Sequence, residues 1–318
     1  MVTPWWTRGS GFAEGKGEHS LESEYQKTQK EETRLRLTRL QTFLRRLRRN
    51  TLSFSALIII LAITLMAIVA PLISPYDPNA TDANKALFSV SLKHPMGTDI
   101  FGRDILSRVI YAARVDLLVA LVATILALSI GSLLGSLSGY SGGWLDHLVM
   151  RIVDTVMSFP SFVLAMGITA ALGNKLINVV IAIAITHIPI YTRLIRGEML
   201  HIREMEYAEA ARTVGNPRSR IIFYHLLPNC FPPVIVQATL AMGWVILTVA
   251  GLSFIGLGIQ PPASEWGYMT AEGATYIVSG EWWVFLFPGL AIMITVLCFN
   301  MVGDALRDIL DPRMRGIR

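Results

Sequence analysis

The chain has 318 residues, of which 53% are hydrophobic and 16% are charged, and 28 Lys and Arg against 23 Asp and Glu give a net charge of +5. Since roughly a quarter of the residues in a soluble domain are charged, this composition excludes a water-soluble enzyme as the default and favours an integral membrane protein. The two cysteines, Cys230 and Cys298, form no CxxC motif and support neither a disulfide framework nor a zinc site.

The N-terminal region divides into two parts by composition. Residues 1–30 are rich in Gly, Ser, Glu and Lys, which predicts a disordered cytoplasmic tail. In residues 31–50, leucines recur at helical spacing among arginines, which predicts a basic amphipathic helix on an anionic membrane surface. A solvated helix or a nucleic-acid patch is the alternative. Because the segment leads directly into an apolar run, we expect contact with membrane lipid and not with nucleic acid.

Six apolar runs then predict an all-α membrane protein with six transmembrane helices. The runs are Leu52–Ile73, Val115–Gly139, Ile152–Leu172, Leu176–Tyr191, Val234–Ile259 and Trp282–Val302. The fourth run is short, and Pro189 predicts a kink in it. In the second run, Gly131, Gly135 and Gly139 share one helical face, a spacing that allows close backbone contact between helices.

The distribution of Lys and Arg predicts the orientation of the spans. Nine lie in residues 27–49, six between Arg193 and Arg220, and four after Asp304, whereas residues 260–281 have none. By the positive-inside rule, both termini, the loop 196–230 and a tail at residues 305–318 are cytoplasmic. The first transmembrane helix then covers residues 51–73, and residues 74–114 form an extracytoplasmic segment.

Several kinds of chemistry are missing from the sequence. There is no GxxxxGK[ST] phosphate loop, no HExxH and no GxSxG. The predicted span interiors hold essentially no ionisable groups: His187 is expected to be a packing residue, and Asp154 an interfacial partner of Arg151. A secondary transporter, a channel or an intramembrane enzyme is therefore disfavoured, while a helical scaffold without transport remains open. Uphill transport would need energy from a partner.

The loop between the fourth and fifth runs is longer than a connection requires. Residues 204–214 predict a helix, and Gly215 is suited to the left-handed position that ends it. Asn216 is expected to cap a second helix with Pro217 at its first position, and Pro228 is expected to end that helix. Such a helical corner suits docking into a groove on another protein, and an ordinary surface loop is the alternative.

These residues carry a family resemblance. Glu209-Ala210-Ala211, Gly215 and Leu227-Pro228 resemble the EAA signature of binding-protein-dependent ABC importer permeases. His225 stands where the general pattern has isoleucine, and a histidine at this position resembles the peptide-transport branch of the family. The segments HPMGTDIFGRDILSRVIYAARVDLLVAL, LSFIGLGIQPPASEWG and FNMVGDALRDILDPR resemble the same branch. Over residues 50–315 the chain resembles the C-type permease subunit of dipeptide, oligopeptide or nickel importers.

The resemblance implies a type I ABC importer permease fold in the bacterial cell inner membrane, with a core domain at residues 115–304 that contains five transmembrane helices. The implied partners are a second related permease subunit, two cytoplasmic ATPase subunits that bind the ATP and Mg, and an extracytoplasmic solute-binding protein touched by residues 94–114. The chain itself would hold no cofactor and would not be an enzyme. The substrate is left open among peptides, nickel chelates, glutathione and short oligosaccharides. The residues implied in ATPase coupling are Tyr207, Glu209, Ala210, Ala211, Gly215 and Pro228.

Overall fold

The computed structural model describes residues 50–310 of the protein. The tail expected at residues 1–30, all but the last residue of the expected helix 31–50, and residues 311–318 lie outside this range. Within it, the only regular elements besides an isolated bridge between Thr98 and Asp104 are helical. They are α2 (Thr51–Ile68), α3 (Ala70–Ile73), the 3₁₀ turn η1 (Ala83–Lys85), α4 (Ile105–Ser141), α5 (Gly143–Met157), α6 (Ser161–Leu172), α7 (Leu176–Ile202), α8 (Glu206–Thr213), α9 (Arg218–Arg220), the π turn η2 (Ile221–Leu226), the 3₁₀ turn η3 (Leu227–Cys230), α10 (Phe231–Phe254), α11 (Trp266–Ala274) and α12 (Trp283–Leu310).

Five continuous helical segments of the described residues are long and apolar enough to cross a membrane, and a bent pair brings the number to six if it is one span. The continuous segments are α2, α4, α7, the run from α9 to α10, and α12. The all-α prediction is therefore confirmed, and five of the six predicted runs each coincide with one of these segments. The first run is interrupted at Val69, between α2 and α3, and the fifth extends past the end of α10 at Phe254.

The third predicted span is wrong as a continuous helix. Residues 152–172 are divided between α5 and α6, whose axes differ by 88°. The break lies at Ser158–Pro160, where Pro160 provides no backbone N–H and disfavours helical geometry at the residue before it. Apolar composition alone gave no sign of this turn, because apolar residues continue on both sides of it.

Three helices are longer than the apolar runs that predicted them. α4 begins at Ile105 and not at Val115, because the Asp104 carboxylate caps it by accepting the Ser107 N–H at 2.8 Å. α7 continues through Pro189 to Ile202, and α12 continues past Asp304 to Leu310. Part of the expected outer segment and of the expected C-terminal tail is therefore helix.

The glycine face of α4 packs against α7, as the spacing predicted. A Cβ added at Gly131 would lie 2.6 Å from the Cβ of Tyr191, and one added at Gly135 would lie 2.5 Å from the carbonyl oxygen of Thr192. The two backbones approach so closely that only glycine fits at these positions. Gly139 continues the same contact at the end of α4.

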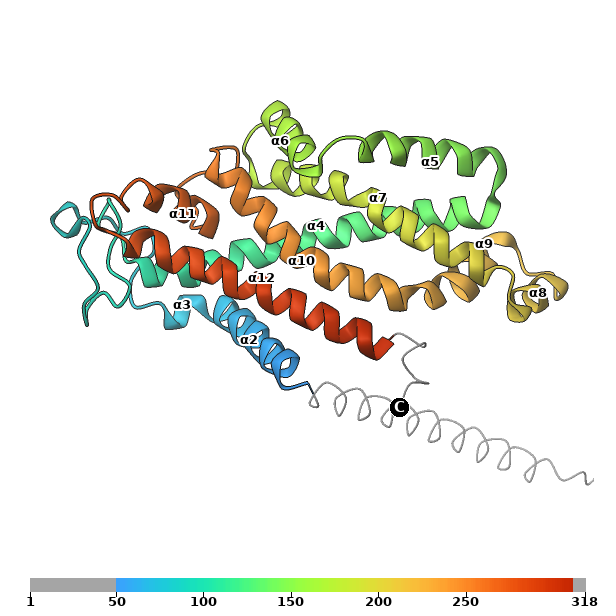
Figure 1. Ribbon diagram of the computed structural model, residues 1–318, viewed down its shortest axis with the longest axis horizontal. Coiled ribbons are helices and arrows are strands. Elements are labelled where there is room, and N and C mark those ends of the chain that lie inside the picture. The colour runs from blue at the N-terminus through green and yellow to red at the C-terminus, as the bar shows by residue number, and fades with distance from the viewer. Residues whose placement is uncertain (1–49, 311–318) are drawn as a thin grey trace, which may run out of the picture. The chain divides into compact units, whose positions relative to one another are not determined.

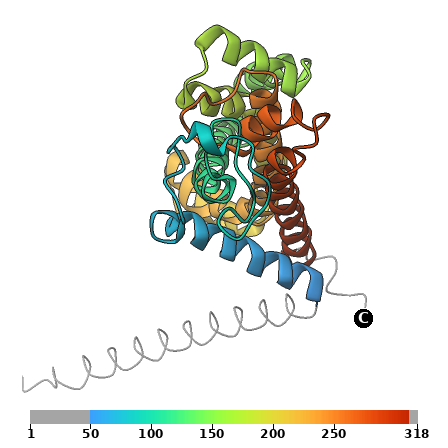
Figure 2. The ribbon, with the colours of Figure 1, turned by 90° about the vertical axis from the view of Figure 1, so that its left-hand side faces the viewer.

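The short helices lie at the two ends of the bundle (Figure 1). α8 and α9 are at one end, and α11 is at the other, close to the N-terminal ends of α4 and α12. In the end-on view, α2 and the α5–α6 pair lie on opposite sides of the bundle (Figure 2). The loop 196–230 and the segment 74–104 are thus separated by the length of the spans.

Candidate functional site

α8 is the short helix that projects at one end of the bundle. Its first turn contains Glu206 and Glu209, whose negative charges interact favourably with the positive, N-terminal end of the helix dipole. Ala208 and Ala211 are buried against the chain's own residues, among them Ile221 and Leu226. The methyl groups therefore seat α8 on this end of the bundle, and the other faces of the helix are exposed.

Gly215 forms the sharp corner after α8, as predicted. Its φ is +82°, a left-handed conformation that costs a residue with a Cβ about 1 kcal/mol or more. The Gly215 N–H donates to the carbonyl of Arg212 at 2.9 Å, and the Asn216 N–H donates to that of Ala211 at 3.3 Å. This pair of bonds is a Schellman motif, which satisfies carbonyls at the helix end.

The predicted second helix differs in its start and its end. The Asn216 side chain does not cap it; the amide Nδ2 donates to the Ala211 carbonyl at 3.1 Å and so closes α8 instead. Pro217 occupies the N-cap position itself. Pro228 does not end the helix either, because η2, η3 and α10 follow one another without an interruption. Pro228 is tolerated there at the start of a 3₁₀ turn, where its missing N–H has little effect.

The expected coupling residues divide by exposure. Tyr207 is 43% exposed, and Glu209, Ala210, Gly215 and Pro228 are also exposed. Partial burial raises the pKa of the Tyr207 phenol, which therefore stays neutral. Ala211 faces inward and is 8% exposed, so it packs α8 in place and presents no surface to another protein.

Two ion pairs attach α5 to α7. Arg196 binds Asp146 in a bidentate manner, with Nε–Oδ1 at 2.5 Å and Nη2–Oδ2 at 2.7 Å. Farther along, Asp154 accepts from Arg193 at 2.5 Å and not from Arg151, its expected partner. Asp154 pairs with Arg193 because this arginine approaches from a different helix, α7. Residue spacing along α5 cannot reveal such a partner.

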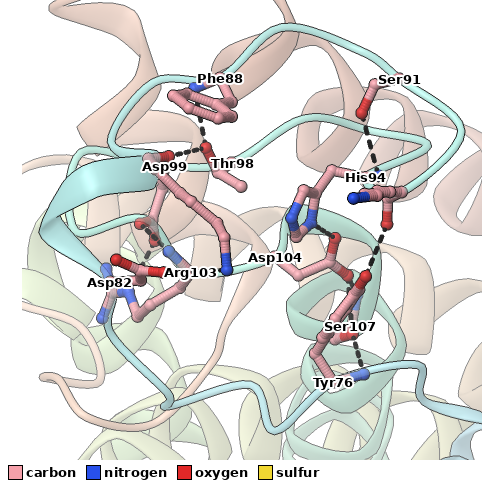
Figure 3. Close-up of polar contacts among 12 residues, drawn as sticks. Tyr76, Asp82, Phe88, Ser91, His94, Thr98, Asp99, Arg103, Asp104 and Ser107 are labelled. Carbon is pink, nitrogen blue, oxygen red and sulfur yellow. Dashed lines mark hydrogen bonds and ion pairs between the residues drawn. The ribbon is translucent and has the colours of Figure 1, made fainter.

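At the opposite end, the segment 74–104 is held to the start of α4 by a chain of polar contacts (Figure 3). His94 Nδ1 lies 2.9 Å from Asp104 Oδ1, Ser107 Oγ donates to Asp104 Oδ2 at 2.7 Å, and the Tyr76 N–H donates to Ser107 Oγ at 3.1 Å. The ring of Tyr76 stacks on that of His94. This segment is therefore an ordered structure fixed on the N-terminal end of α4.

Buried charges attach α11 to α4. The carboxylate of Asp99 binds both Arg103 and Arg108, and Glu272 of α11 lies 3.4 Å from Arg103 and 3.6 Å from Arg108. Burial raises the pKa of Glu272, and the nearby Arg108 opposes the rise. Spacing along the chain does not predict this cluster, because Glu272 is far in sequence from Asp99, Arg103 and Arg108.

A second acidic group lies at the other end of α11. Glu265 is fully buried and caps α11, since its carboxylate accepts the N–H groups of Gly267 and Tyr268, each at 2.7 Å. Asp116, buried in α4, accepts the Trp266 N–H at 3.1 Å. Burial raises the pKa of Glu265. The expected lack of ionisable groups inside the spans is therefore wrong at Asp116. This residue stands at the edge of the apolar run Val115–Gly139, but it lies well inside the helix because α4 begins at Ile105.

A cavity of about 410 Å³ lies between α6, α10, α11 and α12. None of its lining residues is charged. Aromatic rings of Phe162 and Trp244 and hydroxyl groups of Ser161, Thr248 and Thr270 contribute to its wall. Within residues 50–310, no group of three His, Cys, Asp or Glu side chains is placed to hold a metal ion.

Comparison with known proteins identifies the family. Residues 131–316 match the family described as "Binding-protein-dependent transport system inner membrane component", and residues 38–95 match the "N-terminal TM domain of oligopeptide transport permease C". The chain belongs to this family of ABC importer permeases. It is a multi-pass inner-membrane protein and a permease component of an ABC importer, not an enzyme. The resemblance drawn from the EAA residues is thus confirmed.

Curated relatives cover most of the chain. It is 47% identical to the dipeptide transport system permease protein DppC of Alkalihalophilus pseudofirmus, over 86% of this chain and 89% of the relative. It is 46% identical to the probable D,D-dipeptide transport system permease protein DdpC of Escherichia coli, over 85% and 90%. It is 42% identical to the glutathione transport system permease protein GsiD of Escherichia coli, over 86% and 90%.

A solved structure shares the fold. The inward-facing MetNI methionine ABC transporter contains a chain that is 19% identical and superposes with a TM-score of 0.52, over 64% of this chain and 97% of that one. The type I permease fold expected from the sequence is therefore present.

Proposed function

We propose that the permease forms half of the translocation pathway for peptides, paired with a second related permease subunit. Two cytoplasmic ATPase subunits and an extracytoplasmic solute-binding protein complete the importer. The observation that carries this proposal is the projecting corner of α8 and Gly215, at the end of the bundle opposite to α11. A short exposed helix that is fixed to the spans is suited to transmit motion from a partner.

The exposed face of α8 is the docking surface for an ATPase subunit. Glu206 and Glu209 are exposed and make no ion pair with any of the described residues, so a basic groove on the partner would complement them. Tyr207 and Val214, which is 82% exposed, add apolar area. Closure of the ATPase pair would push this surface and tilt the spans. ATP and Mg bind to the partners, since the chain has no phosphate loop.

Orientation follows from the same assignment. The basic residues near α8 favour a cytoplasmic position for it and for both termini, and an outer position for the segment 74–104. The ordered outer segment, with α11 beside it, is then the surface that receives the solute-binding protein.

Peptides are the substrate class that we favour. The relatives named above are described for dipeptides, D,D-dipeptides and glutathione, all of which contain amide-linked amino acids. The cavity beside α6 and α10 has an uncharged wall with hydroxyl groups, which suits peptide groups better than a metal ion. Uptake of labelled dipeptide, competed with glutathione or a nickel chelate, distinguishes these substrates.

The experiment that tests the docking surface is Gly215→Asp in the reconstituted importer. The substitution forces a residue with a Cβ into the left-handed conformation and adds a charge to the docking surface. We expect normal abundance in the membrane, loss of ATP-dependent uptake and weaker co-purification of the ATPase subunits. Glu209→Ala should act in the same direction but less severely, because it removes one contact and leaves the backbone unchanged.

The matched control is Gly280→Asp. Gly280 also has a positive φ, +105°, and no atom would lie within 4 Å of an added Cβ, but it lies in the connection between α11 and α12. ATPase co-purification should be unaffected by this variant. Full uptake and full ATPase retention in Gly215→Asp would refute the docking assignment. Uptake that continues after ATP depletion would instead support a secondary transporter.

A further inference from the structure

Two arginines join the docking helix to the spans. Arg203 directly follows α7, and its Nη1 donates to the carbonyl of Gly139 at 2.8 Å and to that of Tyr140 at 3.5 Å. These carbonyls belong to the last turn of α4, which has no partner within its own helix. A guanidinium at this place also complements the negative end of the α4 dipole. Arg203 therefore fastens the end of α7 to the end of α4.

The second arginine comes from α8 itself. Arg212 Nη2 donates to the backbone carbonyl of Arg203 at 2.8 Å, and its guanidinium lies over the ring of Tyr140, 5.8 Å from the centroid. The contact thus runs from α8 to the end of α7 and to the end of α4. Besides this bond, α8 is seated mainly by the small side chains of Ala208 and Ala211, which give little resistance to rocking.

The helices that receive this contact move together. Gly135 and its neighbours bring the backbones of α4 and α7 into direct contact, so one cannot slide past the other. Asp146 adds α5 to the unit, since it binds Arg196 of α7 and accepts from Ser138 of α4 at 2.5 Å. A displacement at the ends of α4 and α7 is therefore shared by three helices.

We propose that Arg203 and Arg212 are positioning residues that transmit the movement of α8 to α4, α5 and α7. The inference rests on the proposed docking of an ATPase subunit on α8. Without Arg212, α8 still presents its docking surface, but it rocks on the connection after α7 and the spans do not follow. ATP hydrolysis then continues with much less import for each ATP. This is a different failure from loss of docking at Gly215.

The test is Arg212→Ala in the complete importer reconstituted in vesicles, with uptake and ATP hydrolysis measured in the same sample. We expect the ATPase subunits to be retained and the uptake per ATP hydrolysed to fall by about tenfold, as for the loss of a charge-assisted hydrogen bond. Arg220→Ala is the matched control. Arg220 also lies in the cytoplasmic element and stacks on an aromatic ring, that of Tyr224, but the ring belongs to its own segment. It should leave the ratio unchanged.

The two arginines act in series, so their effects should not add. Combining Arg203→Lys with Arg212→Ala should lower the ratio no further than Arg212→Ala alone. If Arg212→Ala reduces membrane abundance, Arg212→Gln takes its place, with the same lowered ratio expected at normal abundance. An unchanged ratio in the Arg212 variants would overturn the relay while leaving the docking surface intact. Loss of the ATPase subunits would overturn it too, because Arg212 would then be a docking contact.

Discussion

Replacing Gly135 by alanine tests the contact between α4 and α7 most directly. The added Cβ would lie 2.5 Å from the carbonyl oxygen of Thr192, 3.0 Å from the Cβ of Ile195 and 3.1 Å from the backbone nitrogen of Arg196. Ordinary contacts begin near 3.4 Å, and these neighbours are backbone atoms or atoms fixed to the backbone. No side chain can rotate away, so α7 itself must retreat by about 1 Å.

The size of the effect follows from two opposing contributions. Overpacking of a close contact costs about 1–3 kcal/mol. Alanine in place of glycine stabilises a helix by about 0.5–1 kcal/mol, because the unfolded chain with alanine has less conformational freedom to lose on folding. We therefore expect a net destabilisation of about 1 kcal/mol and at most about 2.5 kcal/mol, which lowers the unfolding temperature by about 2–4 °C per kcal/mol.

The measurement is the temperature at which half of the detergent-solubilised chain stays monodisperse. Gly197→Ala is the control from the same helix pair: Gly197 lies in α7, and nothing would come within 4 Å of its added Cβ. This variant should be as stable as the natural chain or slightly more stable. Equal stability of Gly135→Ala and Gly197→Ala would show that the two backbones are not in contact at Gly135, and the close-packing argument would fail.

Two other predictions concern the outer end and the orientation. Glu265→Ala removes both acceptors at the start of α11, and we expect the free energy of unfolding to fall by about 1–2 kcal/mol. Glu265→Gln retains one acceptor oxygen and should be destabilised less. Equal destabilisation of the two variants in thermal unfolding would argue against capping. A reporter fused after Arg318 should label as cytoplasmic and one inserted near Ala83 as external; opposite labelling at either site would contradict the six-span topology.

The sequence determined the features that depend on local pattern. Apolar runs of sufficient length identified five spans, because a long apolar segment can satisfy its backbone hydrogen bonds within one helix; the third run, which is bent between α5 and α6, was the exception. The left-handed corner at Gly215 was predictable because the chemistry of a helix end depends on a few consecutive residues. The glycine face of α4 was also readable, since residues four apart lie on one side of a helix. The sequence did not show that α7 is the helix that packs against this face.

The tertiary structure decided every feature that depends on which residues meet across helices. Asp154 pairs with Arg193 and not with its sequence neighbour, and Asn216 closes the helix before it and not the one after it. Buried Asp116 and Glu265 come together at the start of α11 although they are far apart in the chain. A polar group in the interior is stable only where the fold supplies its partner, and spacing along the chain does not specify that partner. The same holds for Arg203 and Arg212, whose acceptors are carbonyls that became available only where α4 and α7 end side by side.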